Sequence, residues 1–387
     1  MNAVTLDDRL KALRGAAGDM ARELRAHALA LDADPGDVKP LADTAASGLI
    51  RALTTPPRFA GGPLRLGRFT YRPGSCLDQA VCAAELAAGD AGALLACPGP
   101  GLAGVLVDSL ADEGRQDRFY RAVADAETWT FFAVTEPGRG SDAAEMDTRL
   151  SRDGADGYRL YGVKRYIGNG ARGRLGVVFG RTGPGPLSIR AALLESPADG
   201  FEATALDMVG LRGAGLGELR FDGVAVPEEM LLGRHLPTTR RGLWGAMRVF
   251  HQMRAQVAAL ALGTGTALVE LVSAERPGAP RIDEFTDRLQ AGRRLVYAAA
   301  AALDADPDEG HRSSVAKAVA TALGREISRW AIGALDPVAL VEQPLLEKWT
   351  RDMIAFEFME GTTNIQRRHI SRAYLQGRLP SSEASVS

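Results

Sequence analysis

Cysteine and lysine are scarce in this chain, and long hydrophobic segments are missing. The three cysteines, Cys76, Cys82 and Cys97, do not have the spacing of metal ligands, and their odd number suits a reducing cytosol better than a disulfide framework. Only five of the 46 basic residues are lysines, no long basic run occurs, and 48 acidic residues bring the net charge to -2. This near balance excludes a broad nucleic-acid-binding face.

The longest uncharged run, residues 91–107, contains two prolines and four glycines. It is shorter than the ~20 apolar residues that a membrane-spanning helix needs. The first fifteen residues carry acids and lack the apolar stretch of a signal peptide. We therefore expect a cytoplasmic protein with no membrane partner and no metal site. Its 387 residues, 46% of them hydrophobic, suffice for two or three domains.

Three regions differ in their hydrophobic pattern. Residues 1–125 repeat apolar side chains at a helical period and predict an N-terminal α-helical domain. Residues 126–235 consist of short β-prone runs punctuated by Gly, Pro and Asp, which indicates an antiparallel sheet or a barrel. Residues 236–387 return to the helical period. The fold class is therefore α+β and multidomain.

The C-terminal region predicts a four-helix bundle, because four apolar helices follow one another with short connections. Three of them are expected over 248–272, 287–304 and 345–358. The fourth carries an apolar stripe with Ser313 or Ser314 as its N-cap, and the stripe consists of Val315, Val319, Leu323 and Ile327.

Gly99 to Gly104 spell GPGLAG, a literal match to the G-x-G-x-x-G dinucleotide fingerprint. That fingerprint requires a strand before it and a helix after it. Here the preceding run has a helical pattern and Pro100 stiffens the turn. We interpret the segment as a break between helices that lines a pocket.

The segment TEPGRGSD, residues 135–142, follows a β-prone run and contains Pro137, Gly138 and Gly140. These residues produce a tight turn whose backbone N–H groups can face a ligand. Such a loop could hold the polar edge of a flat heterocycle or a phosphate. An ordinary turn between strands explains the same residues.

Glu360 lies in a Met-Glu-Gly-Thr junction between two helical stretches. Gly361 permits a bend, and Thr362 or Thr363 can cap the helix that follows. Apolar neighbours would raise the pKa of the Glu360 carboxyl, while the adjacent helix N-terminus favours its anion. Glu360 is therefore either a general base or a simple helix-cap acid.

Four motifs in a fixed order resemble the acyl-CoA dehydrogenase family. They are TEPGRGSD, YGVKRYIGNG, the run from GLRG to FDGVAVPEEMLLG, and MEGTTNIQRRHISR, and together they span residues 131–372. The resemblance implies FAD as cofactor, an N-terminal helical domain, a middle β-barrel-like domain and a C-terminal four-helix bundle. It also implies that Glu360 removes the α-proton of an acyl thioester while the β-hydrogen passes as hydride to flavin N5.

The family's other functional positions carry over one by one. The implied flavin contacts are Val134, Thr135, Gly140, Ser141, Tyr166, Ile167, Gly168, Thr362 and Asn364. Arg276 matches an arginine that reaches the FAD of a neighbouring subunit, which implies a homodimer or homotetramer. The implied substrate contacts are His251, Arg254, Gly361 and Arg372. Met253 occupies the position of an alternative family base, so Glu360 is the base candidate.

The chain departs from the family pattern at the flavin and at the subunit boundary. Gly168 replaces a hydroxyl residue, Pro277 to Pro280 replace an expected Phe-Gly, and Ala334 to Pro337 replace a Gly-Gly-x-Gly stretch. These departures suggest a biosynthetic bacterial relative that acts on acyl-CoA or on an acyl-carrier-protein and needs an acceptor for the electrons of the reduced flavin. A flavin monooxygenase or oxidase on the same fold, or a flavin-free acyl or carrier-protein binder, remain the alternatives.

Overall fold

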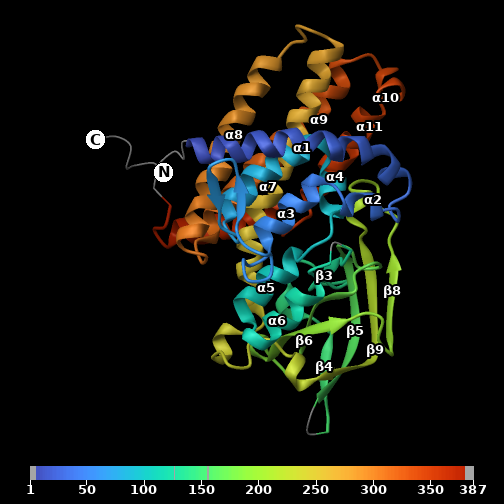
Figure 1. Ribbon diagram of the computed structural model, residues 1–387, viewed down its shortest axis with the longest axis vertical. Helices are drawn as coiled ribbons and strands as arrows, with labels where there is room; N and C mark the ends of the chain where they lie inside the picture. Colours follow the sequence, from blue (N-terminus) through green and yellow to red (C-terminus); the bar gives the residue numbers. More distant parts are fainter. Residues whose placement is uncertain (1–5, 126, 155–156, 380–387) are drawn as a thin grey trace.

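The computed structural model describes residues 6–125, 127–154 and 157–379. Helix α1 (Asp8–Ala33) crosses the middle of the molecule, with the β-sheet below it and the long C-terminal helices rising above it (Figure 1). The chain therefore builds helices, then a sheet, then helices, and the predicted α+β class is confirmed.

The N-terminal helices begin at side-chain caps. The Asp7 carboxylate accepts from the N–H of Leu10, and Ser75 caps α4 (Cys76–Ala96) in the same way. The other helices of this region are α2 (Lys39–Ala42), α3 (Ala45–Thr54), α5 (Gly101–Leu110) and α6 (Glu113–Ala122). A short hairpin of β1 (Leu64–Leu66) and β2 (Phe69–Tyr71), which the helical pattern did not predict, interrupts them.

The GPGLAG segment follows α4 and runs into the first turn of α5, so a helix and not a strand precedes it. This placement is incompatible with the dinucleotide fingerprint. Its interpretation as a break between helices agrees with the structure.

Seven strands form the middle sheet, in the order β3-β6-β4-β5-β9-β8 with β7 paired to β6. Their bounds are β3 Thr130–Ala133, β4 Arg149–Asp153, β5 Gly157–Ile167, β6 Leu175–Arg181, β7 Ile189–Glu195, β8 Phe201–Ala205 and β9 Gly217–Pro227. Most pairs are antiparallel as predicted, but β3 and β4 each pair with β6 in parallel.

The C-terminal helices are α7 (Leu243–Glu275), α8 (Ile282–Ala305), α9 (Gly310–Ala334), α10 (Ala339–Glu342), α11 (Pro344–Ala355) and α12 (Thr363–Leu375). Helices α7 and α8 extend beyond the predicted ranges 248–272 and 287–304, whereas α11 ends three residues before the predicted residue 358. Ser313 and Ser314 are not the N-cap of α9: they lie in its first turn and donate to the Gly310 carbonyl. Val319 of the predicted stripe is 45% exposed, because the buried face of α9 is offset from it.

By length and composition α7 could cross a membrane, yet 72% of its most apolar window is buried inside the protein. This burial is what a core helix requires. Helix α4 packs against α7, and its residues Ala80, Ala84 and Ala87 share one hydrophobic core with α7, α8, α9 and α11. Other α4 residues, such as Leu86, belong to the core under α1. Helix α4 therefore joins the N-terminal and C-terminal helices.

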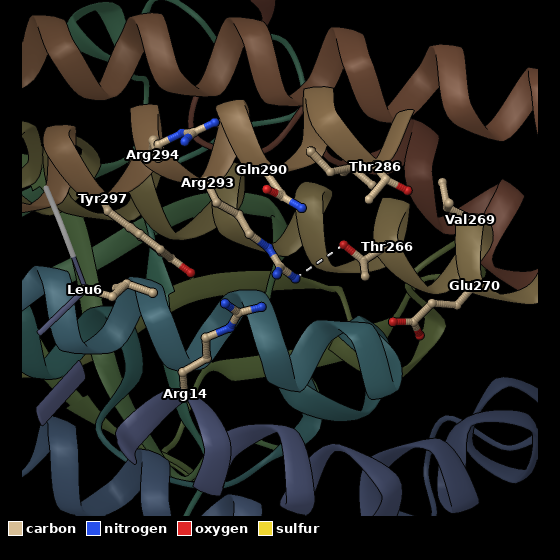
Figure 2. Close-up of a pocket in the computed structure, with 11 residues that line it drawn as sticks. Leu6, Arg14, Thr266, Val269, Glu270, Thr286, Gln290, Arg293, Arg294 and Tyr297 are labelled. Carbon is tan, nitrogen blue, oxygen red and sulfur yellow. Dashed lines mark hydrogen bonds between the residues drawn. The ribbon is translucent and has the colours of Figure 1, made fainter. Parts of the chain in front are cut away.

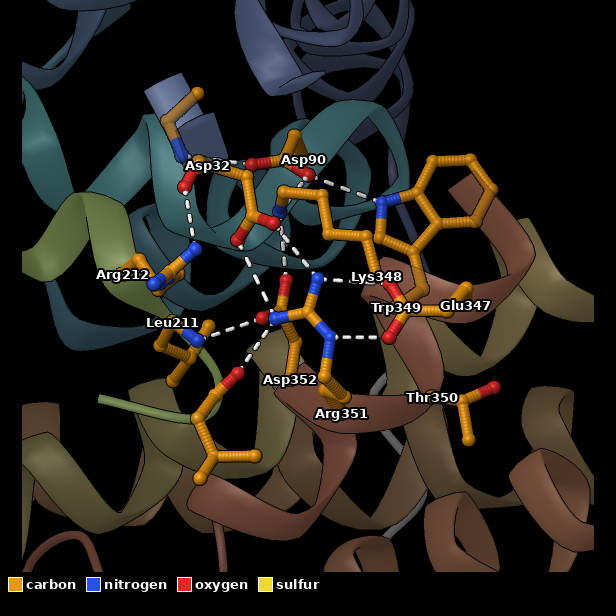
Figure 3. A network of polar contacts seen from close by, with 12 residues as sticks. Asp32, Asp90, Leu211, Arg212, Glu347, Lys348, Trp349, Thr350, Arg351 and Asp352 are labelled. Carbon is orange, nitrogen blue, oxygen red and sulfur yellow. Dashed lines mark hydrogen bonds and ion pairs between the residues drawn. The ribbon is translucent and has the colours of Figure 1, made fainter. Parts of the chain in front are cut away.

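A buried polar network fixes the contact between α4 and α11 (Figure 3). The Lys348 ammonium lies 2.6 Å from an Asp90 carboxylate oxygen and 2.7 Å from one of Asp352. Asp90 also accepts from the indole N–H of Trp349 at 3.0 Å, and Asp352 accepts from the backbone N–H of Leu211 at 2.6 Å. Helix α4 kinks at Asp90, whose backbone leaves the helical conformation. One lysine thus ties α4, α11 and the loop before β9 together.

Candidate active site

The turn that carries Glu360 has an unusual backbone. It connects α11 to α12, and Glu360 has φ 52° while Gly361 has φ 91°. Glycine adopts positive φ freely, but a glutamate does so only where its surroundings hold the backbone. Such constrained residues cluster at functional sites, so this conformation marks the turn for closer inspection.

Side chains from three helices hold this turn through its carbonyl groups. The carbonyl of Glu360 accepts from Arg254 Nε of α7 at 3.2 Å and from Gln366 Nε2 of α12 at 3.1 Å. The carbonyl of Gly361 accepts from Lys317 Nζ of α9 at 2.7 Å and again from Gln366 at 2.7 Å. Arg254, Lys317 and Gln366 are all buried. The geometry of the turn is therefore set by one nearby residue, Gln366, and by two residues distant in the sequence, Arg254 and Lys317.

The Glu360 carboxylate is left free by these contacts. Its Oε2 atom is buried and has no hydrogen-bond partner among the residues that the structure describes. Burial raises the pKa of this carboxyl from 4.5 to about 7, although the nearby charges of Arg254 and Lys317 act in the opposite direction. A carboxylate with a pKa near neutrality and a free oxygen is suited to be a general base.

Glu357, and not Glu360, caps helix α12. Its two carboxylate oxygens accept from the backbone N–H of Thr363 at 2.8 Å and from the Thr363 hydroxyl at 2.7 Å. Thr362 occupies the N-cap position, but its side chain makes no capping hydrogen bond, contrary to the prediction that Thr362 or Thr363 would cap the helix. The helix-cap interpretation of Glu360 thus loses its basis, since a different glutamate performs that task.

Replacing Glu357 by alanine is expected to lower the free energy of unfolding by about 0.5–2 kcal/mol, as for other lost helix caps. Chemical denaturation monitored by circular dichroism measures this loss. A Glu357→Ala protein as stable as the wild type would contradict the assignment of the cap.

Among the predicted substrate residues, Gly361 follows Glu360 in the turn, Arg254 contacts the turn from α7, and His251 and Arg372 lie on α7 and α12. Arg254 Nη2 lies 3.4 Å from His369 Nε2, and His251 Nδ1 lies 3.4 Å from the carbonyl of Pro307. Burial lowers the pKa of both histidines to about 4, so both rings are neutral at pH 7. Arg372 is exposed on α12, three residues beyond His369 and on the same side of the helix.

The apolar neighbours of Glu360 only partly match the expectation. Phe356 is fully buried, but Phe358 is 67% exposed and cannot desolvate the carboxyl.

The predicted flavin loop is fixed by a buried ion pair. Glu136 accepts from the backbone N–H groups of Asp147 at 2.7 Å and Thr148 at 2.9 Å, and lies 3.0 Å from Lys164 Nζ. Lys164 also donates to the carbonyl of Val134 at 2.9 Å. Sequence reasoning missed both ion-pair partners, because their contact spans 28 residues. The pair secures the loop from the protein side and leaves Gly140 and Ser141 exposed.

The predicted second flavin segment sits at an irregularity of the sheet. The pairing of β5 with β9 shifts register between Lys164 and Ile167, and Tyr166 there has φ 60° and is 52% exposed. Ile167 points into the core. The N–H of Arg165 donates to the carbonyl of Thr135 at 2.9 Å, so the loop and this strand end lie side by side.

The predicted flavin contacts leave backbone and side-chain groups open to a ligand. A Cβ atom added at Gly138 or Gly168 would meet nothing within 4 Å, so open space lies beside the backbone there. Strand β3 meets the first part of α7 through Phe132 and Phe250, whose ring centroids are 6.1 Å apart. This contact places β3 against α7 about one helical turn before Arg254. The side chains of Thr362 and Asn364, two and four residues beyond Glu360, make no hydrogen bond to another residue that the structure describes.

Arg276 lies elsewhere in the protein. It follows the last residue of α7, about 33 Å along the helix from Arg254. Its guanidinium donates to the carbonyl of Ala334 at 2.8 Å, within the segment that replaces the family's Gly-Gly-x-Gly. A single chain does not bring Arg276 to its own Glu360.

Two cavities lie on the faces of α7. One of about 180 Å³ is lined by Cys76, Val105, Arg248, Gln252 and Leu303, among others, close in sequence to His251 and Arg254. The other, of about 440 Å³, lies between α1, α7 and α8, and contains none of the predicted site residues (Figure 2).

Comparisons with known proteins agree with this geometry. The family models named acyl-CoA dehydrogenase, middle domain and C-terminal domain, match residues 131–224 and 279–375. An acyl-CoA dehydrogenase of Bacillus subtilis is 30% identical over 284 residues, which cover 69% of this chain and 73% of the relative. The short-chain specific acyl-CoA dehydrogenase of Rattus norvegicus is 29% identical over 63% of each chain.

Solved structures show the same fold. Butyryl-CoA dehydrogenase from Megasphaera elsdenii superposes with a TM-score of 0.83 at 24% identity, over 97% of this chain and 100% of the other. PigA, solved with FAD and proline, superposes with a TM-score of 0.83 at 19% identity, over 98% of this chain and 100% of the other. The chain belongs to the acyl-CoA dehydrogenase family. It is thus an FAD-dependent oxidoreductase of the acyl-CoA dehydrogenase type.

Proposed function

We propose that this protein oxidises the Cα–Cβ bond of an acyl thioester, with Glu360 as the base that takes the α-proton. The observation that supports this most directly is the buried Glu360 Oε2, which has no partner among the described residues and belongs to a carboxyl with a pKa of about 7. A base of this kind accepts a proton readily near neutral pH. When bound, FAD supplies an acceptor for the β-hydrogen, which leaves the substrate as hydride with two electrons.

The loop around Thr135 and the strand end at Tyr166 would hold the flavin ring, and Thr362 and Asn364 would contact it beside the base. The N–H of Glu360 belongs to the constrained turn and can donate to the thioester carbonyl, where negative charge develops as the α-proton leaves. Arg254 fixes this turn from α7. The chain's contribution is thus to orient the substrate, to hold the carboxylate free and to accept the proton.

The acyl group would enter the cavity of about 180 Å³ beside α7. Val105 and Leu303 give that cavity an apolar wall, while Arg248 and Gln252 make part of it polar. Much of its lining comes from the first 125 residues, the part of the chain that the family motifs do not cover. We infer that these residues set the identity of the acyl group, on coenzyme A or on a carrier protein.

The electron acceptor and the assembly are proposed from relatives and from surface composition. A relative from Acetobacterium woodii, 26% identical over 78% of this chain, is named as a subunit of a caffeyl-CoA reductase–Etf complex. We propose an electron-transferring flavoprotein as acceptor.

A homodimer or homotetramer formed through the C-terminal region is supported by apolar side chains that are exposed there. They are Val319, Ile332, Val338, Val341 and Ile354.

The purified protein is expected to carry about one FAD per chain and to lose its flavin absorbance when an acyl-CoA is added without oxygen. Extraction of the flavin with mass spectrometry, followed by anaerobic titration with acyl-CoA thioesters of increasing length, measures both. A colourless protein that FAD cannot reconstitute would identify a flavin-free binder. A flavin that consumes oxygen and yields a hydroxylated product would identify an oxygenase.

A further inference from the structure

We propose that Lys317 is a positioning residue for the Glu360 base: its buried ammonium holds the 357–361 turn by its carbonyls, so that the Glu360 carboxylate stays free for substrate. This inference deepens the proposed function and rests on it. Sequence reasoning gave Lys317 no role.

Lys317 differs from the two other buried lysines in its partners. Lys164 pairs with Glu136 at 3.0 Å, and Lys348 pairs with two aspartates at 2.6 and 2.7 Å. Lys317, fully buried on α9, has no carboxylate within 4.0 Å among the described residues. A buried cation without an ion pair is costly, since burial favours its neutral form. Burial accordingly lowers the pKa of Lys317 to about 8. A stabilising role alone does not require such a residue.

The ammonium donates instead to two main-chain carbonyls on either side of the base. Nζ lies 3.2 Å from the carbonyl oxygen of Glu357 and 2.7 Å from that of Gly361. These bonds bridge the stretch in which Glu360 and Gly361 both have positive φ. The carbonyl of Glu360 itself accepts hydrogen bonds from Arg254 and Gln366. Three carbonyl groups of the turn, those of Glu357, Glu360 and Gly361, are therefore held by buried side chains. None of these hydrogen bonds uses the carboxylate.

The charge of Lys317 has a second effect on the base. Together with Arg254 it lowers the pKa of the Glu360 carboxyl, against the larger effect of burial. Removing the ammonium is therefore expected to raise that pKa further. The titratable and charged groups around the turn are Arg254 and His251 from α7, Lys317 and Arg325 from α9, Glu357 from the turn itself, and His369 from α12.

Two substitutions separate the charge of Lys317 from its hydrogen bonds. Lys317→Met removes both and keeps much of the volume, while Lys317→Gln removes the charge and retains a donor. Gln366→Met is the matched control, because it removes neutral hydrogen bonds to the carbonyls of Glu360 and Gly361 and leaves every charge in place. All are tested as holoenzymes for flavin content, thermal stability and the pH profile of anaerobic flavin reduction by an acyl-CoA.

Both Lys317 variants are expected to retain flavin. In both, the fall in the rate of flavin reduction on the acid side of the pH profile should be displaced to higher pH. A rise of about one unit in the pKa of the base lowers its ionised fraction at pH 7 about five-fold, and the rate should recover toward pH 9. Lys317→Met should be slower than Lys317→Gln at every pH, because it also loosens the turn. If Lys317→Met fails to fold, the displaced pH dependence of flavin reduction in Lys317→Gln decides the question.

The inference is overturned if the Lys317 variants lose thermal stability but keep the wild-type rate and pH profile, which is the behaviour of a structural residue. It is also overturned if Gln366→Met displaces the profile equally. Glu360→Gln in the same assay tests the proposed function separately. If flavin reduction is blocked in Glu360→Gln but normal in Lys317→Met, only the role of Lys317 is refuted. If the flavin of Glu360→Gln is reduced at the normal rate, the proposed function is refuted.

Discussion

Substituting glutamine for Glu360 is expected to leave FAD bound and to slow anaerobic flavin reduction by ~10²–10⁴-fold, the range for a lost general base. Glutamine preserves the shape of the side chain but cannot accept the α-proton. Stopped-flow absorbance at the flavin band, with an acyl-CoA that reduces the wild type rapidly, measures the change. The Glu357→Ala protein is the matched control, since it removes a neighbouring glutamate of the same turn that caps α12. A Glu360→Gln enzyme that is reduced at the wild-type rate would refute the base.

The same substitution has a consequence for stability that needs no substrate. The folded-state pKa of Glu360 is raised from 4.5 to about 7, so the folded protein holds a proton there that the unfolded chain releases. This group therefore lowers the free energy of unfolding as the pH rises from about 4.5 to 7, and the loss is complete above that window. Glu360→Gln should lack this loss. Denaturation of both proteins at pH 5 and pH 8 should show the variant gaining relative stability at the higher pH.

Replacing Lys348 by methionine is expected to lower the free energy of unfolding by about 3–5 kcal/mol, because it leaves two buried carboxylates without their cation. Asp90 and Asp352 are fully buried, and each lies within 2.7 Å of the Lys348 ammonium. Denaturant titration measures the loss. The comparison variant is Lys11→Met, whose lysine pairs with Asp8 on an exposed surface and should change stability by less than about 1 kcal/mol.

A second variant checks that the lost charge pairing is the cause. Adding Asp90→Asn and Asp352→Asn to Lys348→Met removes the uncompensated charges, and a large part of the stability should return. If the triple variant is less stable than Lys348→Met, the network stabilises the protein chiefly by its hydrogen bonds to Trp349 and Leu211 and not by charge compensation.

The sequence could predict what local residues determine. The α+β class follows from hydrophobic periods, and Glu360 stands out because a glycine and a helix start follow it. The partners of the turn could not be found in this way. Lys317 and Arg254 reach it from helices about 40 and 100 residues earlier, and only packing brings them there. One signal for Lys317 was present: a lysine, rare in this chain, amid the small and apolar residues of α9.

Other errors have equally specific causes. The serines at 313 and 314 have the chemistry of an N-cap, but α9 begins earlier, at Gly310, and buries them. The parallel pairing of β3 with β6 leaves no mark in either strand's sequence, because a β-prone run specifies neither its partner strand nor their relative direction. Glu357 was overlooked as a cap since it acts from six residues before Thr363, outside the usual capping distance.

Helix α4 belongs to both the N-terminal and the C-terminal helical cores, and this limits which segments can be exchanged between this protein and its relatives. Its small residues pack on α7, its other face lies under α1, and Asp90 is anchored on α11. The three-part order along the chain is therefore not a set of interchangeable modules. A chimaera that takes the C-terminal helices of a relative must therefore also take that relative's α4. The sheet is no independent module either, because its core includes side chains of α5, α6 and the start of α7, and the loop before β9 is bonded to Asp352 of α11.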